Sequence, residues 1–160
     1  MEIEVEKYES KKELYESMNN SLISLLKESN DLVSNLSNVS ALIKLFLDDI
    51  NWAGFYLMKD GALTLGPFQG KPAVTKICMG QGVCGTAAEE KKTRRIDNVH
   101  ECSNHIACDL ASSSEIVVPI IANDKVLGVL DIDSPIIARF DEEDERGLEG
   151  IVETLLSAFE

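Results

Sequence analysis

The stretch that decides the fold is residues 115–133, EIVVPIIANDKVLGVLDID. Two apolar runs within it, 115–122 and 126–133, flank the turn residues Asn123-Asp124-Lys125. Runs of this length around a short polar turn are typical of an antiparallel β-hairpin. Pro135 follows the second run, and proline cannot donate a ladder hydrogen bond to a neighbouring strand. The stretch therefore predicts two paired strands, the second of which ends before Pro135.

The rest of the chain supplies helices and an earlier hairpin. Ser10, either Asn30 or Asp31, and Asp141 are suited to cap three helices whose apolar side chains recur at helical spacing. The Asp60-Gly61 turn predicts the first hairpin. Outside residues 115–133, the sequence predicts helices over 10–28, 31–48, 86–90 and 142–159, and strands over 51–58, 62–65 and 74–78.

Helices at both ends of an antiparallel sheet are typical of an α+β domain. We expect one domain over residues 1–160. Its N-terminal helices should lie in 1–50, its sheet and site loops in 51–134, and its C-terminal helix in 141–159. The two terminal helices are also suited to form a homodimer, or to pack on their own sheet.

Composition excludes several classes of function. The chain has 28 acidic and 15 basic side chains, a formal net charge of −13. Binding to nucleic acid needs clustered Lys and Arg, so we expect no nucleic-acid partner. No apolar run reaches the roughly 18 residues that a membrane span needs, and the acidic N-terminus lacks the apolar core of a secretory signal. We therefore expect a cytoplasmic protein without a membrane partner, whose four cysteines are thiols.

Thiol and imidazole groups gather between residues 78 and 108, and two kinds of chemistry fit them. His100, Cys102, His105 and Cys108 are all zinc-ligand types, but their spacing matches no standard finger or ribbon. In the other interpretation, an accessible thiol in a polar loop is a nucleophile.

The sequence context separates the cysteines. Cys108 lies in a polar loop, and Cys84 lies between glycines near the start of a short helix, where a thiolate would be stabilised. Cys78, between Ile77 and Met79, is expected to be a buried apolar residue.

Three carboxylates accompany these thiols. Glu115 opens a strand, and Asp131 and Asp133 are two residues apart at the end of another. Alternation along a strand puts the two aspartates on one face. They form either an acidic pocket for a cationic group or a strand end that emerges into solvent. A partly desolvated Glu115 with other acids close by should have a raised pKa, which suits a general acid.

Six motifs along the chain belong together: NWAGFY (51–56), GPFQG (66–70), GQGVCGTA (80–87), HIACD (105–109), SEIVVP (114–119) and GVLDIDS (128–134). Jointly they resemble the free methionine-(R)-sulfoxide reductases, which are GAF-domain enzymes. The similarity covers nearly the whole chain from the second predicted helix onward. It implies a central antiparallel sheet flanked by helices. It also implies reduction of free L-methionine (R)-sulfoxide to L-methionine with thioredoxin as the external reductant and no bound cofactor or metal.

The resemblance also implies roles for individual residues. Cys108 would be the catalytic cysteine and Cys84 its redox partner. A sulfoxide oxygen must be protonated before it can leave, and Glu115 could be the acid that donates this proton. Trp52 and Tyr56 would form an aromatic wall for the methyl end of the substrate. The acids implied to line the substrate site are Glu115, Asp131 and Asp133.

The chain departs from the family pattern at one position. A third cysteine, commonly the resolving thiol, usually lies ten residues before the cysteine of the GVCG run; here that residue is Val74. Cys78 is offset from it by four residues, roughly 13 Å along a strand. Cys84 could resolve, with Cys78 and Cys102 as additional candidates, or the activity is weakened. A third alternative is a GAF module that binds a small molecule or senses redox state without turnover. We expect no attached output domain, which favours the enzyme.

Overall fold

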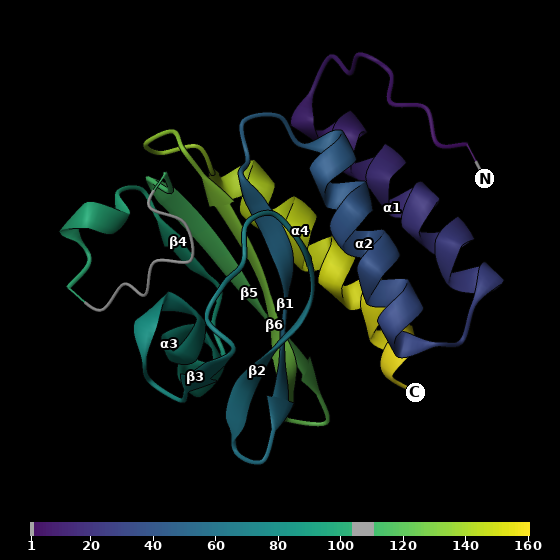
Figure 1. Ribbon diagram of the computed structural model, residues 1–160. Helices are drawn as coiled ribbons and strands as arrows, with labels where there is room; N and C mark the ends of the chain where they lie inside the picture. Colours follow the sequence, from purple (N-terminus) through teal and green to yellow (C-terminus); the bar gives the residue numbers. More distant parts are fainter. Residues whose placement is uncertain (1, 104–110) are drawn as a thin grey trace.

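A computed structural model describes residues 2–103 and 111–160. Over this part of the chain, six strands form one antiparallel sheet in the order β3-β2-β1-β6-β5-β4 (Figure 1). The strands are β1 (Trp52–Lys59), β2 (Ala62–Gln69), β3 (Lys76–Cys78), β4 (Arg94–Ile96), β5 (Ser114–Ala122) and β6 (Lys125–Ser134). The helices are α1 (Lys11–Glu28), α2 (Leu32–Phe46), α3 (Gly82–Glu90) and α4 (Glu142–Leu155), with 3-10 turns η1 (Val99–Glu101) and η2 (Leu156–Phe159). The α+β class is confirmed.

The helices cover the sheet unequally. Figure 1 shows α1, α2 and α4 against one face and α3 beside the other. Phe55 and Leu130 belong to the larger core, under the three helices. Trp52, Tyr56 and Val129, on the same two strands, belong to a second apolar cluster on the α3 side. Because side chains alternate along a strand, β1 and β6 line both cores.

The hairpin predicted over residues 115–133 is confirmed. β5 and β6 pair along their whole length, with Ser114 opposite Ser134 and Ala122 opposite Lys125. Asn123 and Asp124 both have positive φ, 51° and 64°. Asn and Asp tolerate this conformation better than most residues and are typical of the tight turns that match strand twist. β6 ends at Ser134, before Pro135.

The caps predicted for the long helices are also confirmed. Ser10 Oγ accepts from Glu13 N at 3.2 Å, and Asp31 Oδ1 accepts from Ser34 N at 2.8 Å. At α4, Asp141 accepts from the backbone of Asp144 while the Asp144 side chain accepts from Asp141 N. Each bond satisfies a backbone donor that the helix start leaves free.

The sequence misplaces several short segments. α3 begins at Gly82 rather than residue 86, because glycine at its start hides the helical pattern. β2 continues to Gln69 through residues expected to be loop, and its pairing register shifts between Gly54 and Tyr56 of β1. The strand expected from residue 74 begins at Lys76, and the polar edge strand β4 was not predicted. Residues 156–159 form a 3-10 turn rather than α-helix. No described helix is both long and apolar enough to span a bilayer.

Candidate functional site

The α3 side of the sheet carries a row of acids. Asp133 of β6 lies opposite Trp52 of β1 on one side and opposite Glu115 of β5 on the other. Asp131, two residues earlier on β6, faces the same way because strand side chains alternate. The relative exposures of Glu115, Asp131 and Asp133 are 3%, 1% and 2%. These acids are therefore buried, and the alternative of a strand end that emerges into solvent is wrong.

α3 adds a thiol to this row. Cys84, in the first turn of α3, is buried, and its Sγ lies 4.0 Å from Glu115 Oε1. Ligand atoms of Cys84, Glu115 and Asp131 all lie within 4.8 Å of one another. The close fit of the helix start depends on Gly85, because a Cβ there would lie 2.4 Å from the carbonyl oxygen of Cys78. The structure thus brings together one cysteine and two acids that the sequence singles out.

Burial sets the protonation of these groups. Burial raises the pKa of the Cys84 thiol well above its usual value, and the charges of Asp131 and Glu115 raise it further. The expectation that the helix start stabilises a Cys84 thiolate is therefore wrong, because burial and the neighbouring acids outweigh the helix dipole. Burial likewise raises the pKa of Glu115, to which the charge of Asp133 adds. The pKa of Asp131 is raised by burial and by Glu115. The raised pKa predicted for Glu115 is therefore supported, and the site favours protonated forms or a positively charged partner.

An aromatic wall stands beside the acids. The Trp52 ring stacks on Tyr56, with centroids 6.0 Å apart, and on Phe68, with centroids 5.1 Å apart. Trp52 Nε1 donates to Lys71 O at 3.1 Å, and the Tyr56 hydroxyl donates to Val74 O at 2.9 Å. Both rings are buried and are fixed at their polar ends. Phe68, inside the GPFQG motif, thus belongs to the aromatic wall, although its position in the sequence indicates no role for it.

The other thiols lie in different surroundings. Cys78 is exposed, so the expectation that it is buried is wrong. It ends the short edge strand β3, where Ile77 packs toward the α3-side cluster and the next side chain points to the opposite face. Cys102 is half-buried and packs against the α3-side cluster. Val74, at the usual third-cysteine position, is exposed.

Cys108 and His105 lie outside the described residues 2–103 and 111–160. His100 is exposed in η1, where its backbone N–H donates to Asn98 Oδ1 at 3.0 Å.

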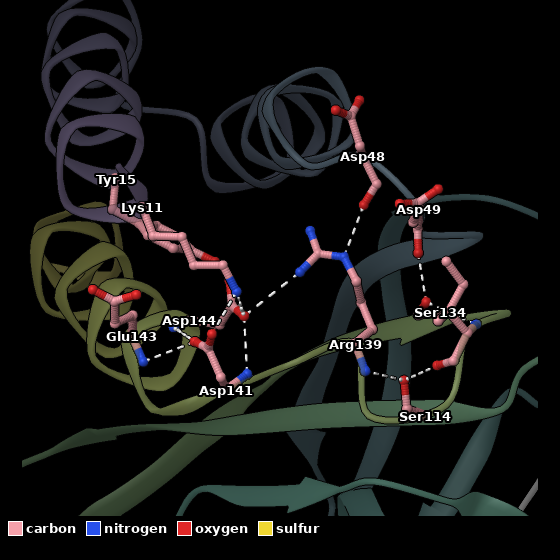
Figure 2. Close-up of polar contacts among 11 residues, drawn as sticks. Lys11, Tyr15, Asp48, Asp49, Ser114, Ser134, Arg139, Asp141, Glu143 and Asp144 are labelled. Atoms are coloured by element: carbon pink, nitrogen blue, oxygen red, sulfur yellow. Dashed lines mark hydrogen bonds and ion pairs between the residues drawn. The ribbon is translucent and has the colours of Figure 1, made fainter. Parts of the chain in front are cut away.

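Hydrogen bonds fix the strand ends next to the acids (Figure 2). Ser114, the neighbour of Glu115, donates through Oγ to Ile136 O at 2.5 Å and accepts from Arg139 N at 3.3 Å. Ser134, the neighbour of Asp133, donates through Oγ to Asp49 O at 2.5 Å. The segment after β6 therefore holds the start of β5, and the segment before β1 holds the end of β6.

The comparisons with known proteins agree with this architecture. The family model of the GAF domain matches residues 21–158. Free methionine-R-sulfoxide reductase of Escherichia coli is 48% identical over 146 residues, 91% of this chain and 88% of that protein. The protein of the same name from Saccharomyces cerevisiae is 50% identical over 131 residues, 77% of this chain and 73% of that protein.

Two solved structures extend the likeness to the fold. The structure of fRMsr of Staphylococcus aureus in complex with substrate has a TM-score of 0.86 at 48% identity, covering 91% of this chain and 95% of that one. Free methionine-R-sulfoxide reductase from Neisseria meningitidis, in complex with its substrate, has a TM-score of 0.94 at 37% identity, covering 99% and 96%. The resemblance found in the motifs is confirmed, and the chain belongs to the GAF-domain family of free methionine-R-sulfoxide reductases.

Proposed function

We propose that this protein reduces free L-methionine (R)-sulfoxide to L-methionine through a cysteine sulfenic acid and a disulfide, with thioredoxin as the reductant. Membership of the family supports the reaction. The observation that carries the proposal is the buried thiol of Cys84, 4.0 Å from the buried carboxyl of Glu115 beside the aromatic wall. Reduction of a sulfoxide requires a thiol and a proton donor, and binding of its methylthio group requires an apolar surface.

The acids and the wall bind opposite ends of the substrate in this proposal. Asp131 and Asp133 face the substrate ammonium, because a buried carboxylate is stabilised by a cation. The stacked rings of Trp52 and Tyr56 contact the methylthio end. A free amino acid provides the ammonium, whereas a methionine inside a peptide does not. This arrangement therefore selects the free amino acid.

The chemical step transfers one oxygen atom. The Cys108 thiolate attacks the sulfoxide sulfur while Glu115, kept protonated by its raised pKa, donates a proton to the oxygen. The oxygen passes to the cysteine sulfur, which becomes a sulfenic acid, and methionine leaves. Because the sulfoxide sulfur gains the two electrons that the cysteine sulfur loses, the step balances.

Cys84 completes the cycle in this proposal. Its sulfur attacks the sulfenic acid, a disulfide to Cys108 forms, and water is released. A thioredoxin dithiol then restores both thiols by exchange and is itself oxidised. Cys84 is favoured over Cys78 because it lies beside the acids, whereas Cys78 is exposed at the sheet edge.

The test couples thioredoxin oxidation to free methionine (R)-sulfoxide. Wild type should turn over the free (R)-sulfoxide, and a methionine sulfoxide within a peptide should not react. We expect Cys108→Ser to abolish the activity. Cys84→Ser should stop after one methionine per protein, and its sulfenic acid should be detected by mass spectrometry. Cys78→Ser and Cys102→Ser are the matched controls and should retain the Cys84–Cys108 disulfide.

Two results would contradict the proposal. Sulfoxide binding without methionine release would favour the module that binds without turnover. Multiple turnovers in Cys84→Ser, lost in Cys102→Ser, would move the resolving role to Cys102.

A further inference from the structure

Three metal-ligand types meet at one buried point between α3 and the sheet. Within residues 2–103 and 111–160, Cys84, Glu115 and Asp131 form the group that could hold a metal ion. It differs from the zinc set considered from the sequence, which consists of His100, Cys102, His105 and Cys108. All three residues are buried, and they come from α3, β5 and β6, which are separate elements.

The distances suit a small ion. Zinc bonds to sulfur at about 2.3 Å and to carboxylate oxygen at about 2.0–2.2 Å, so tetrahedral geometry separates the sulfur and oxygen by about 3.6 Å. Cys84 Sγ and Glu115 Oε1 are 4.0 Å apart. A contraction of a few tenths of an ångström brings the sulfur and this oxygen to zinc geometry. The other ligand atoms lie within 4.8 Å of one another, so Asp131 has to move further inward than Glu115 to reach the ion.

A second observation points to a ligand at the same place. The Asp131 side chain is 1% exposed and hydrogen-bonds to Cys84 and Glu115, but among the described residues its Oδ1 atom has no hydrogen-bond partner. A buried carboxylate oxygen is costly unless a donor or a cation satisfies it. A divalent ion would satisfy this oxygen and offset most of the charge of one thiolate and two carboxylates.

The ligand set selects the ion. Calcium and magnesium prefer shells made of oxygen alone, and calcium takes six or more ligands. A thiolate with two carboxylates fits a borderline-soft ion that accepts four ligands. We propose that Cys84, Glu115 and Asp131 form a binding site for a zinc ion in the reduced protein.

The consequence for the enzyme is inhibition. A zinc ion at this point occupies the Cys84 thiol and the acids assigned above to the substrate. Zinc and free methionine sulfoxide would therefore exclude one another, and the bound thiolate could not resolve a sulfenic acid. This consequence rests on the proposed function, whereas the binding site itself does not, so binding is tested without substrate.

The experiment titrates reduced, metal-free protein with Co²⁺, which reports a cysteine ligand through a near-ultraviolet sulfur-to-cobalt charge-transfer band. Wild type should develop the band at one cobalt per chain, and Zn²⁺ should remove it by displacement. Cys84→Ser should lose the band. Asp131→Asn should weaken the affinity for cobalt by at least about tenfold. Cys78→Ser is the control with an unchanged number of buried thiols, and its band should equal that of wild type.

Several outcomes would overturn the inference. One is the absence of the band in wild type, and another is its persistence in Cys84→Ser. If the band persists in Cys84→Ser and is lost in Cys108→Ser, the cysteine ligand is Cys108. If Cys84→Ser does not fold, the near-isosteric Asp131→Asn decides, and unchanged cobalt affinity in that variant refutes the site. A protein that binds cobalt through Cys84 but does not reduce sulfoxide would retain the metal site and refute only the proposed function.

Discussion

At the scale of single residues, the acids of the site oppose the stability of the fold. Glu115 and Asp131 are buried, and burial raises the pKa of each. Between the ordinary pKa and the raised one, the native state binds more protons than the unfolded state. The free energy of unfolding therefore falls as pH rises through that interval. The carboxyl groups of Glu115 and Asp131 thus lower the free energy of unfolding at neutral pH.

Glu115→Gln should remove this cost. We expect the free energy of unfolding at pH 7 to rise by about 1–2 kcal/mol, because a neutral amide replaces a group whose charged form is unfavourable. The gain should shrink as pH falls toward the ordinary pKa of glutamate. Activity should drop by about 10²-fold or more, because the proposed proton donor is lost.

Urea unfolding at a series of pH values measures the effect. The exposed Glu153→Gln is the matched control and should change stability by less than about 0.5 kcal/mol. A gain for Glu115→Gln that does not vary with pH would show that ionisation of Glu115 is not its source.

The sequence predicts best those site residues whose position follows from the alternation of a strand. The period of two put Asp131 and Asp133 on one face without any tertiary information. Cys78 was misjudged because its neighbours are apolar, and only the position of β3 at the sheet edge turns its side chain outward. The approach of Cys84 to Glu115 depends on how α3 docks, which no local pattern encodes.

At the scale of elements, a polar junction joins the starts of α1 and α4 (Figure 2). Asp144 is 1% exposed and accepts from the Tyr15 hydroxyl at 2.8 Å and from Lys11 Nζ at 2.7 Å. Arg139 Nη1 lies 3.5 Å from the same carboxylate. Asp144 is therefore a buried charge with several partners that come from α1 and from the segment before α4.

Asp144→Asn should destabilise the protein by about 3 kcal/mol. It leaves the half-buried Arg139 without its anion and removes one of the two carboxylates that pair with Lys11. The same substitution at Asp124, which pairs with Lys91 but is 93% exposed, should cost less than about 0.5 kcal/mol. Chemical denaturation of both variants makes the comparison. Equal losses would mean that the junction contributes no more than a surface ion pair.

Two glycines of α4 provide a second pair of variants. A Cβ at Gly147 would lie 2.3 Å from the Tyr15 ring, whereas one at Gly150 meets nothing within 4 Å. Gly147→Ala should therefore cost about 1–3 kcal/mol by forcing α1 and α4 apart. Gly150→Ala should add about 0.5–1 kcal/mol through helix propensity. Thermal unfolding distinguishes the two variants. A stabilised Gly147→Ala would show that α1 shifts to accommodate the added methyl group without cost.

Long elements were predictable because their periodicity and caps are local, as for α1, α2 and the β5–β6 hairpin. Short ones were not. β4 has the sequence Arg94-Arg95-Ile96, which has no alternating pattern, and it is a strand because β5 offers it an edge to pair with.

At the scale of the whole molecule, the two faces of the sheet have different roles, one in stability and one in the candidate site. The face under α1, α2 and α4 holds the larger apolar core, and the opposite face holds the acids and the aromatic wall. A ligand that neutralises the buried acids should therefore stabilise the whole fold, because it binds the native state alone.

L-Methionine, the proposed product, tests this coupling. At about 100 times its dissociation constant it adds about 2.7 kcal/mol, which for a chain of this size raises the melting temperature by about 5–10 °C. N-acetyl-L-methionine lacks the ammonium charge and should give no rise. In Asp133→Asn the rise should shrink. Equal shifts in melting temperature with both compounds would show that the buried acids do not recognise the ammonium group of the ligand.

The pairing of β1 with β6 bears on how the protein is made. Trp52 lies opposite Asp133, so the centre of the sheet joins two segments some eighty residues apart. A ribosome delivers β1 and β2 long before their central neighbour exists, and loop closure over such a span slows strand pairing. Nascent chains halted before residue 125 should stay sensitive to protease, and resistance should arise only once β6 has left the exit tunnel.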